Sequence, residues 1–176
     1  MKKLRKLLFE IDACHEAIGW ATGKTIEEAV NYCHRGDWLL WLAREIEVEL
    51  EPFILAKAIC AKTVIHLMTD ERSRRAVEVA EAFGLGKATF DELETAAENA
   101  AKAEKEMSAV PYGEYNEYAA AQAATTCAQF YSTATASFVS DTYRSGNRKN
   151  LLETVHIFKT VLGERIIKKV NELLNQ

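Results

Sequence analysis

Apolar residues recur at the spacing of an α-helix through nearly the whole chain, and no segment alternates apolar and polar residues as a half-buried strand does. The 176 residues include only 8 glycines and 2 prolines, so few positions break helices. This length corresponds to about one ordinary domain. We therefore predict an all-α fold, a single-domain helical bundle of about seven or eight helices over residues 1–176.

Local signals place the ends of these helices. Thr25–Glu28 and Thr89–Glu92 each fit a capping box, in which a threonine and a glutamate satisfy each other's backbone amides. Asp37 and Asp70 are expected to cap the helices that follow them. The expected helices cover residues 3–21, 25–34, 38–46, 52–68, 72–83, 89–109, 114–144 and 149–174.

Alanine is concentrated on both sides of Pro111-Tyr112-Gly113, the sharpest break in the chain. Small side chains allow two helices to approach closely. We therefore expect an Ala-rich antiparallel helical hairpin in the C-terminal half, so that residues 96–176 hold this hairpin and the terminal helix and residues 1–95 hold the specific motifs. The same alanine faces also offer a surface for a homo-oligomer.

Charge and hydropathy exclude several classes of protein. The net charge of −4 argues against a general nucleic-acid binder. The most apolar stretch, residues 53–68, is only 16 residues long and contains charged residues, so no membrane span is expected. The four cysteines lack the CxxC spacing and no signal peptide is present, which predicts reduced thiols and a cytoplasmic protein.

The residue patterns contain no recognisable catalytic or metal-binding motif. The doublets Cys14-His15 and Cys33-His34 cannot easily hold one zinc ion, because neighbours in a helix project about 100° apart. The Glu153–His156 segment matches one Glu-x-x-His element, whereas a carboxylate-bridged di-metal bundle needs two. We therefore predict no catalytic residues, no metal site and no cofactor, and a protein that is not an enzyme.

Two groups of residues are the candidate partner-binding sites. The first lies in residues 33–41, where Trp38 and Trp41 share a helix face and can serve as interface anchors or as core residues. Arg35 and Asp37 flank a glycine that we expect to provide a left-handed turn before the helix.

The second group surrounds three arginines within four positions. Pairs between Asp70 and Arg74, and between Arg74 and Glu78, are expected at the i,i+4 spacing. Alternatively, the guanidinium groups face a carboxylate or phosphate of a partner. The candidate residues of this group are Asp70, Glu71, Arg72, Arg74 and Arg75.

With these motifs the chain resembles the immunity proteins associated with bacterial polymorphic-toxin loci, which have phage relatives. The likeness covers mainly residues 13–95. It is carried by Ala13-Cys14-His15-Glu16-Ala17 with Trp20, by Cys33-His34-Arg35-Gly36-Asp37-Trp38 with Trp41, by the Cys60 helix, by Asp70-x-Arg72-x-Arg74-x-Ala76-Val77-Glu78 and by Phe83-Gly84-x-Gly86-Lys87. The resemblance implies a helical domain that binds and blocks a cognate toxin.

The leading hypothesis is therefore a non-enzymatic binding protein that occludes a protein partner, with no nucleic-acid or membrane partner. A negative net charge favours rapid association with the basic surface of a nucleic-acid-directed toxin. The alternative is a phage or mobile-element accessory protein that binds a small phosphate-containing ligand or nucleotide through Arg72, Arg74 and Arg75.

Overall fold

The computed structural model describes residues 2–108, 115–142 and 148–175, and within these ranges the chain forms helices and no strand. The helices are α1 (Lys2–Glu10), α2 (His15–Ala21), α3 (Ile26–Asn31), α4 (Gly36–Glu45), α5 (Leu50–Lys62), the 3-10 helix η1 (Ile65–Leu67), α6 (Glu71–Gly84), α7 (Phe90–Ser108), α8 (Tyr115–Ala128), α9 (Thr135–Asp141) and α10 (Arg148–Leu174). The all-α prediction is confirmed. These ten α-helices exceed the predicted seven or eight because two expected helices are each divided.

The first division separates α1 from α2. Asp12 adopts a left-handed conformation with φ 58°, which aspartate tolerates better than most residues. The amide of Ala13 donates to the carbonyl of Leu8 at 2.9 Å and closes the turn. The apolar stripe of the predicted helix 3–21 therefore continues across a bend.

The second division separates α8 from α9, and a buried lysine lies at the break. The side chain of Lys57 on α5 is fully buried. Its Nζ donates to the carbonyls of Thr126 at 3.3 Å, of Ser132 at 3.1 Å and of Gln129. Carbonyls at a helix end need such donors, so this contact between distant parts of the chain stabilises the end of α8. The break predicted at residues 111–113 and the helix end predicted at Arg144 lie outside the described residues.

Both predicted capping boxes are present. At the start of α3, the amide of Thr25 donates to Glu28 at 2.9 Å and the amide of Glu28 donates to Thr25 at 3.2 Å. Thr89 and Glu92 make the same reciprocal pair before α7. Asp70 caps α6 by accepting from the amide of Arg72 at 2.8 Å.

The expected cap of α4 was wrong. This helix begins at Gly36, so Asp37 lies within its first turn and does not precede it. Gly36 does not have a positive φ, so the expected left-handed turn at this glycine is absent. Its small size matters for helix packing instead. A Cβ atom at this position would lie 3.0 Å from side-chain atoms of both Phe158 and Thr154. The missing side chain therefore allows α4 to lie close against α10.

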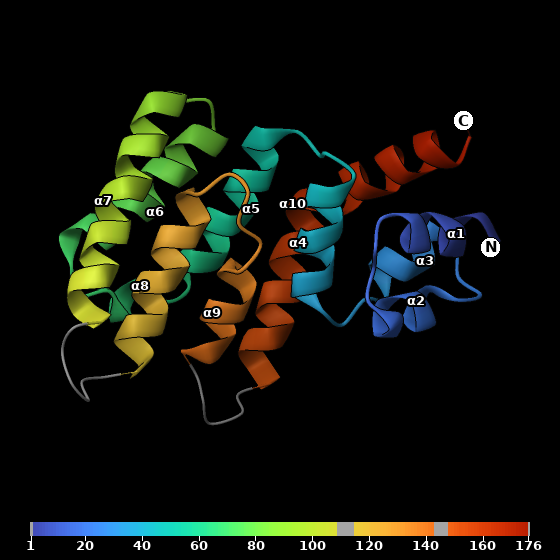
Figure 1. Ribbon diagram of the computed structural model, residues 1–176, viewed down its shortest axis with the longest axis horizontal. Helices are drawn as coiled ribbons and strands as arrows, with labels where there is room; N and C mark the ends of the chain where they lie inside the picture. The colour runs from blue at the N-terminus through green and yellow to red at the C-terminus, as the bar shows by residue number, and fades with distance from the viewer. Residues whose placement is uncertain (1, 109–114, 143–147, 176) are drawn as a thin grey trace.

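The alanine-rich helix α8 lies at the centre of the bundle. It packs against α5, α6, α7 and α9 (Figure 1). Its alanines at positions 119, 120, 121, 123, 124 and 128 are all buried. Alanine leaves room for four neighbouring helices at once. The α7–α8 pair forms the predicted Ala-rich hairpin, and the alanines of α8 are used in packing within the chain.

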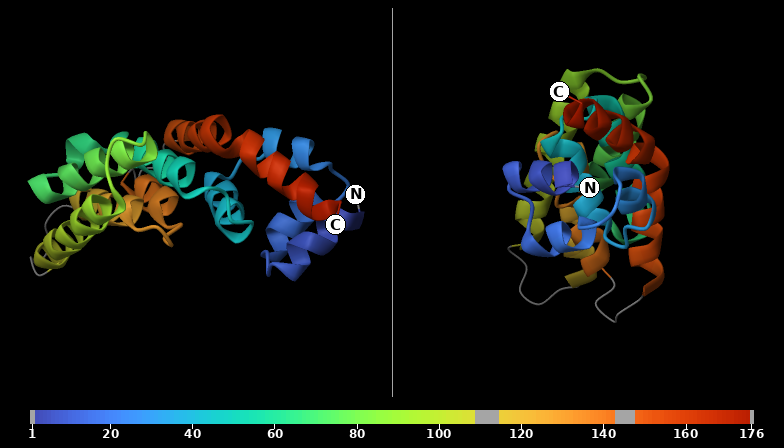
Figure 2. Two further views of the ribbon diagram at one scale, coloured as in Figure 1. Left: turned by 90° about the horizontal axis from the view of Figure 1, so that it is seen from above. Right: turned by 90° about the vertical axis from the view of Figure 1, so that its right-hand side faces the viewer.

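The long helix α10 connects this bundle to the N-terminal helices. Its 27 residues extend about 40 Å. It packs against α4, α5 and α9 and, further along, against α3 and α1. Figure 2 shows α1–α3 at one end of an elongated molecule and α6 and α7 at the other. The side chain of Lys3 donates to the carbonyl of Leu174 at 2.8 Å, so the two ends of the described chain lie together.

Gly84 marks the closest approach between α5 and α6. A Cβ atom on Gly84 would lie 2.5 Å from Cβ of Leu55 and 2.7 Å from its Cα. The turn after α6 instead uses Gly86, which has φ 69°. Within the described ranges, no helix combines the length and hydropathy that a bilayer crossing requires.

Candidate functional site

The first predicted group surrounds Arg35 at the start of α4. Arg35 donates to both carboxylate oxygens of Asp37, at 2.9 and 2.7 Å, and lies 3.6 Å from a carboxylate oxygen of Glu16. Its guanidinium carbon is 4.9 Å from the ring centre of Trp38. The hydrogen bonds with Asp37 raise the pKa of Arg35. This cation is therefore held by neighbours on its own and the adjacent helices.

The two predicted tryptophans are half-buried and pack towards the N-terminal helices. Trp38 and Trp41 line a small cavity of about 50 Å³ together with Leu4, Leu8 and Trp20. His34 lies between Trp20 and Trp38, with ring centres 4.8 and 5.7 Å apart. Both indoles thus join α4 to α1–α3, and these contacts bury much of the apolar surface of the two rings.

The second predicted group is organised by Arg72. Its guanidinium donates to both oxygens of Asp70, at 3.0 and 2.8 Å, and to both oxygens of Glu106, at 3.2 and 2.6 Å. These bonds lower the pKa of both carboxyl groups. Arg72 therefore joins the start of α6 to the end of α7.

The other two arginines form looser pairs than the sequence predicts. The ion pairs join Arg74 to Glu71 at 3.7 Å and Arg75 to Glu78 at 3.3 Å, at the i,i+3 spacing and not between the expected i,i+4 partners. The side chains of Arg74 and Arg75 are 44% and 68% exposed. Exposed pairs of this kind contribute little to stability. Arg74 and Arg75 are therefore exposed enough to contact an anion of a partner in addition to their own glutamates.

The structure does not bring the two predicted groups together. Helix α4 packs mainly against α10, whereas α6 packs against α5, α7 and α8 (Figure 1). Each group would have to act as a separate surface.

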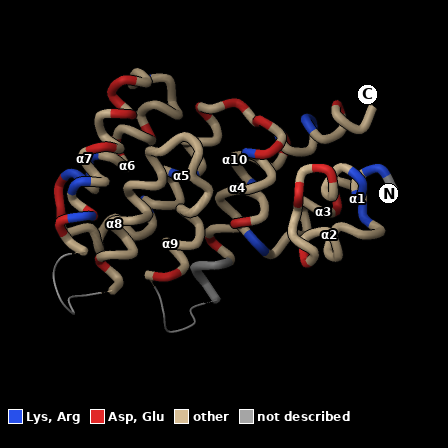
Figure 3. The backbone as a smooth tube through the Cα atoms, viewed as in Figure 1, with Lys and Arg blue, Asp and Glu red and all other residues tan. Residues whose placement is uncertain are grey.

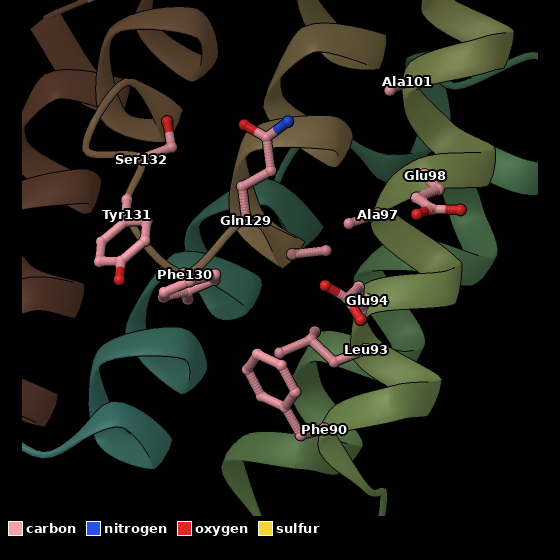
Figure 4. A pocket seen from close by; sticks show the side chains of 11 residues that line it. Phe90, Leu93, Glu94, Ala97, Glu98, Ala101, Gln129, Phe130, Tyr131 and Ser132 are labelled. Carbon is pink, nitrogen blue, oxygen red and sulfur yellow. The ribbon is translucent and has the colours of Figure 1, made fainter.

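A groove that the sequence did not predict lies between α7 and the segment that joins α8 to α9 (Figure 4). Its volume is about 390 Å³, within the range of ordinary ligand pockets. It is lined by Phe90, Leu93, Glu94, Ala97, Glu98, Ala101, Ala128, Gln129, Phe130, Tyr131 and Ser132. The three alanines leave the space that larger side chains would fill.

Exposed aromatic side chains form one end and one side of this groove. Phe90 and Tyr131 are 39% and 72% exposed. The ring centres of Phe90 and Phe130 are 5.7 Å apart, and those of Phe130 and Tyr131 are 3.7 Å apart. Aromatic side chains that remain partly exposed are frequent anchors of protein interfaces.

Two carboxylates stand on the α7 side of the groove. Glu94 and Glu98 are one helical turn apart, and both are exposed. Neither makes a hydrogen bond or an ion pair with the residues that the structure describes. The groove therefore combines an apolar floor with two carboxylates that form no ion pair within the described part of the chain.

Lys57 lies behind the opposite wall. The carbonyls that accept from its Nζ belong to Thr126, Gln129 and Ser132, and the last two of these residues line the groove. Burial lowers the pKa of Lys57 to about 7. The ammonium form has a donor for each of the three carbonyls, so its hydrogen bonds hold this wall in place.

Across residues 2–108, 115–142 and 148–175, no three His, Cys, Asp or Glu side chains are placed to hold a metal ion. Cys33, Cys60 and Cys127 are buried, Cys14 is exposed, and all four are free thiols. Burial raises the pKa of both Cys60 and Cys127 to about 12, so these thiols are packed and unreactive.

Comparison with protein-family models, curated proteins and solved structures finds no match to this chain.

One signal in the sequence does correspond to the groove. Phe90, Glu94, Ala97, Glu98 and Ala101 share one face of a helix, and that face mixes acidic with small residues. The opposite wall gave no such signal, because Phe130 and Tyr131 lie within what reads as one continuous helix over 114–144.

Proposed function

We propose that this chain is a cytoplasmic binding protein that acts by covering a surface of a protein partner and catalyses no reaction itself. The observation that carries the proposal is the groove between α7 and residues 128–132. It offers apolar volume and exposed aromatic side chains, with Phe90 on α7 and Tyr131 on the segment between α8 and α9, both of which pack against the core. A preformed surface loses little conformational entropy on binding.

The resemblance to immunity proteins of toxin loci supports a toxin as this partner. Such a partner is neutralised when its catalytic surface is covered. The net charge of −4 would speed association with a basic toxin, because opposite charges steer the encounter.

Co-expression with the product of the adjoining reading frame tests this proposal. We expect induction of that product alone to arrest bacterial growth, and co-expression of the chain to restore growth and yield a complex that survives size-exclusion chromatography. Growth arrest that persists with the chain present, with no complex between the purified proteins, would contradict the proposal.

The phosphate-ligand alternative depends on the arginines of α6. Because Arg72 is occupied by Asp70 and Glu106, a phosphate would have to bind at Arg74 and Arg75, whose pairs are weak. A nucleotide present at about 100 times its dissociation constant would add roughly 2.7 kcal/mol of stability. Thermal denaturation with a panel of nucleotides therefore tests this alternative, which an unchanged melting temperature would exclude.

Self-association through the Ala-rich helices is a separate proposal. The alanines of α8 are buried within the chain, and so are Ala96, Ala97, Ala100 and Ala103 of α7, so a homo-oligomer would have to use the exposed residues of these helices. Sedimentation velocity over a range of concentrations measures this directly.

A further inference from the structure

We infer that the groove between α7 and residues 128–132 takes a basic segment of a protein partner, with an apolar side chain on its floor and lysine or arginine side chains at Glu94 and Glu98. This inference rests on the proposed binding function and adds the chemistry of the partner. It requires a place for the apolar side chain, two carboxylates that form no ion pair with the described residues and a wall that holds its shape.

The floor of the groove fits a few apolar side chains. Leu93, Ala97, Ala101 and Ala128 contribute only hydrocarbon to it, and Phe90 closes one end (Figure 4). A volume of about 390 Å³ is too small for a whole helix with its backbone and is suited to anchor residues from one. The occupant is therefore a segment that inserts one or two side chains.

The charges of the α7 side specify a cation beside this apolar anchor. Glu94 and Glu98 are on the same face of α7 as the groove-lining alanines, with Cβ atoms about 6 Å apart by helix geometry. Along α7 (Figure 3), Lys102 lies one turn beyond Glu98 and Lys105 lies in the last turn, but neither is within ion-pair distance of Glu94 or Glu98. Two unpaired carboxylates next to an apolar floor favour basic residues one helical turn apart and repel an acidic segment.

The opposite wall is fixed before any partner binds. Lys57 holds the carbonyls of Gln129 and Ser132 from inside the bundle, and the guanidinium of Arg44 donates to the carbonyl of Tyr131 at 3.5 Å. The aromatic rings of Phe130 and Tyr131 are thus attached to a segment with tertiary hydrogen bonds. A groove with one helical wall and one fixed loop wall can select for shape as well as charge.

The direct test uses synthetic peptides and the full chain. The probes are labelled helix-forming peptides with a central Leu, Phe or Trp and lysines one turn away on each side, and matched peptides carry glutamate in place of lysine. Fluorescence anisotropy should detect binding of a lysine peptide and at least tenfold weaker binding of its glutamate counterpart. The preference should shrink when salt rises from about 0.05 to 0.5 M, because exposed charges are then screened. Failure of every lysine peptide to bind, or equal binding of both series, would overturn the inference.

Matched variants then locate the binding. Glu94→Gln with Glu98→Gln removes two charges from the groove and should weaken lysine-peptide binding about fivefold at low salt, as expected for two exposed ion pairs. Glu164→Gln with Glu172→Gln makes the same charge change on exposed positions of α10 and should leave the affinity unchanged. Ala101→Leu fills the groove without altering charge and should abolish insertion of the apolar anchor. Circular dichroism confirms that each variant is folded.

The co-expressed partner separates this inference from the proposed function. If the chain binds and neutralises that partner but the groove variants do so as well as the wild type, the inference fails and the proposed function stands. If no partner complex forms at all, the proposed function fails. Concentration-dependent self-association that Ala101→Leu removes would instead assign the groove to a second copy of the chain and overturn the inference.

Discussion

Replacing Gly84 with alanine places a methyl group against the backbone of α5. The new Cβ would lie 2.5 Å from Cβ, 2.7 Å from Cα and 2.8 Å from the amide nitrogen of Leu55. Ordinary carbon contacts are about 3.5–4.0 Å. Two of these three atoms belong to the backbone, so no rotation of a side chain relieves the overlap, and α5 and α6 must move apart by about 1 Å.

The expected cost follows from this displacement. Overpacking a close-packed interior costs typically ~1–3 kcal/mol, and movement of α5 also disturbs its contacts with α8 and α10. Against this, alanine is favoured over glycine by ~0.5–1 kcal/mol inside a helix, although Gly84 is the last residue of α6 and gains less. We expect a net destabilisation of ~1–3 kcal/mol. This corresponds to a fall in melting temperature of about 2–4 °C per kcal/mol for a chain of this size.

Other helical glycines supply graded controls. Gly19 in α2 has no atom within 4 Å of the position of its Cβ, so Gly19→Ala should stabilise the protein by ~0.5–1 kcal/mol. Gly163→Ala in α10 would meet Val30 at an ordinary 3.6 Å and should be neutral or stabilising. Gly36→Ala, whose Cβ would lie 3.0 Å from side-chain atoms of Phe158 and Thr154 and 3.3 Å from the backbone nitrogen of Val155, should fall between Gly163→Ala and Gly84→Ala, because these contacts are less close than those of Gly84.

Urea denaturation followed by far-ultraviolet circular dichroism measures all four variants on one scale. The free energy of unfolding should be highest for Gly19→Ala and should fall in the order Gly163→Ala, Gly36→Ala and Gly84→Ala. The m-values should be similar if unfolding remains two-state. A Gly84→Ala protein as stable as the wild type would refute the close packing of α5 on α6 and the reasoning from it.

Three further results are expected. Because burial lowers the pKa of Lys57 to about 7 while the unfolded lysine keeps a pKa near 10.5, the unfolded state binds more protons between these values. The free energy of unfolding of the wild type should therefore rise relative to Lys57→Met by up to about 1.4 kcal/mol per pH unit from pH 7 to 10; a parallel pair of curves would contradict this. Arg72→Gln should raise the pKa of Glu106, measured by carboxyl NMR titration, because its main hydrogen-bond donor is removed; an unchanged pKa would mean that the ion pair is not formed in solution. A thiol reagent should modify Cys14 rapidly and the three buried cysteines only after unfolding, and fast reaction of a second thiol would contradict their burial.

Much of the fold could be predicted from the sequence because its signals are local. Capping boxes at Thr25 and Thr89 depend on residues three positions apart, and the structure contains both. The break between α8 and α9 is different. It coincides with a lysine about 70 positions earlier in the chain, whose ammonium satisfies the carbonyls there. In the sequence, Lys57 is only one charged residue within an apolar helix, and nothing near it indicates that it binds carbonyls at residues 126–132.

The candidate sites show the same division between local and distant contacts. The sequence identified Arg35 and Asp37 in one group and Asp70 and Arg72 in the other, but not Glu106, which follows Arg72 by 34 positions. Arg72 consequently joins two helices, a role that its neighbours in sequence could not reveal. The groove depends on placing Phe130 beside Phe90, which is a property of tertiary packing alone.

The position of α10 has a consequence for the order in which the chain can assemble during translation. Helices α1–α3 are made before α4–α10, yet much of their apolar surface is covered by α4 and α10. Part of the apolar surface of α1–α3 therefore stays exposed until more than a hundred further residues have been synthesised and α10 can pack against it. During that interval the apolar surface of α1–α3 is exposed to non-specific contacts.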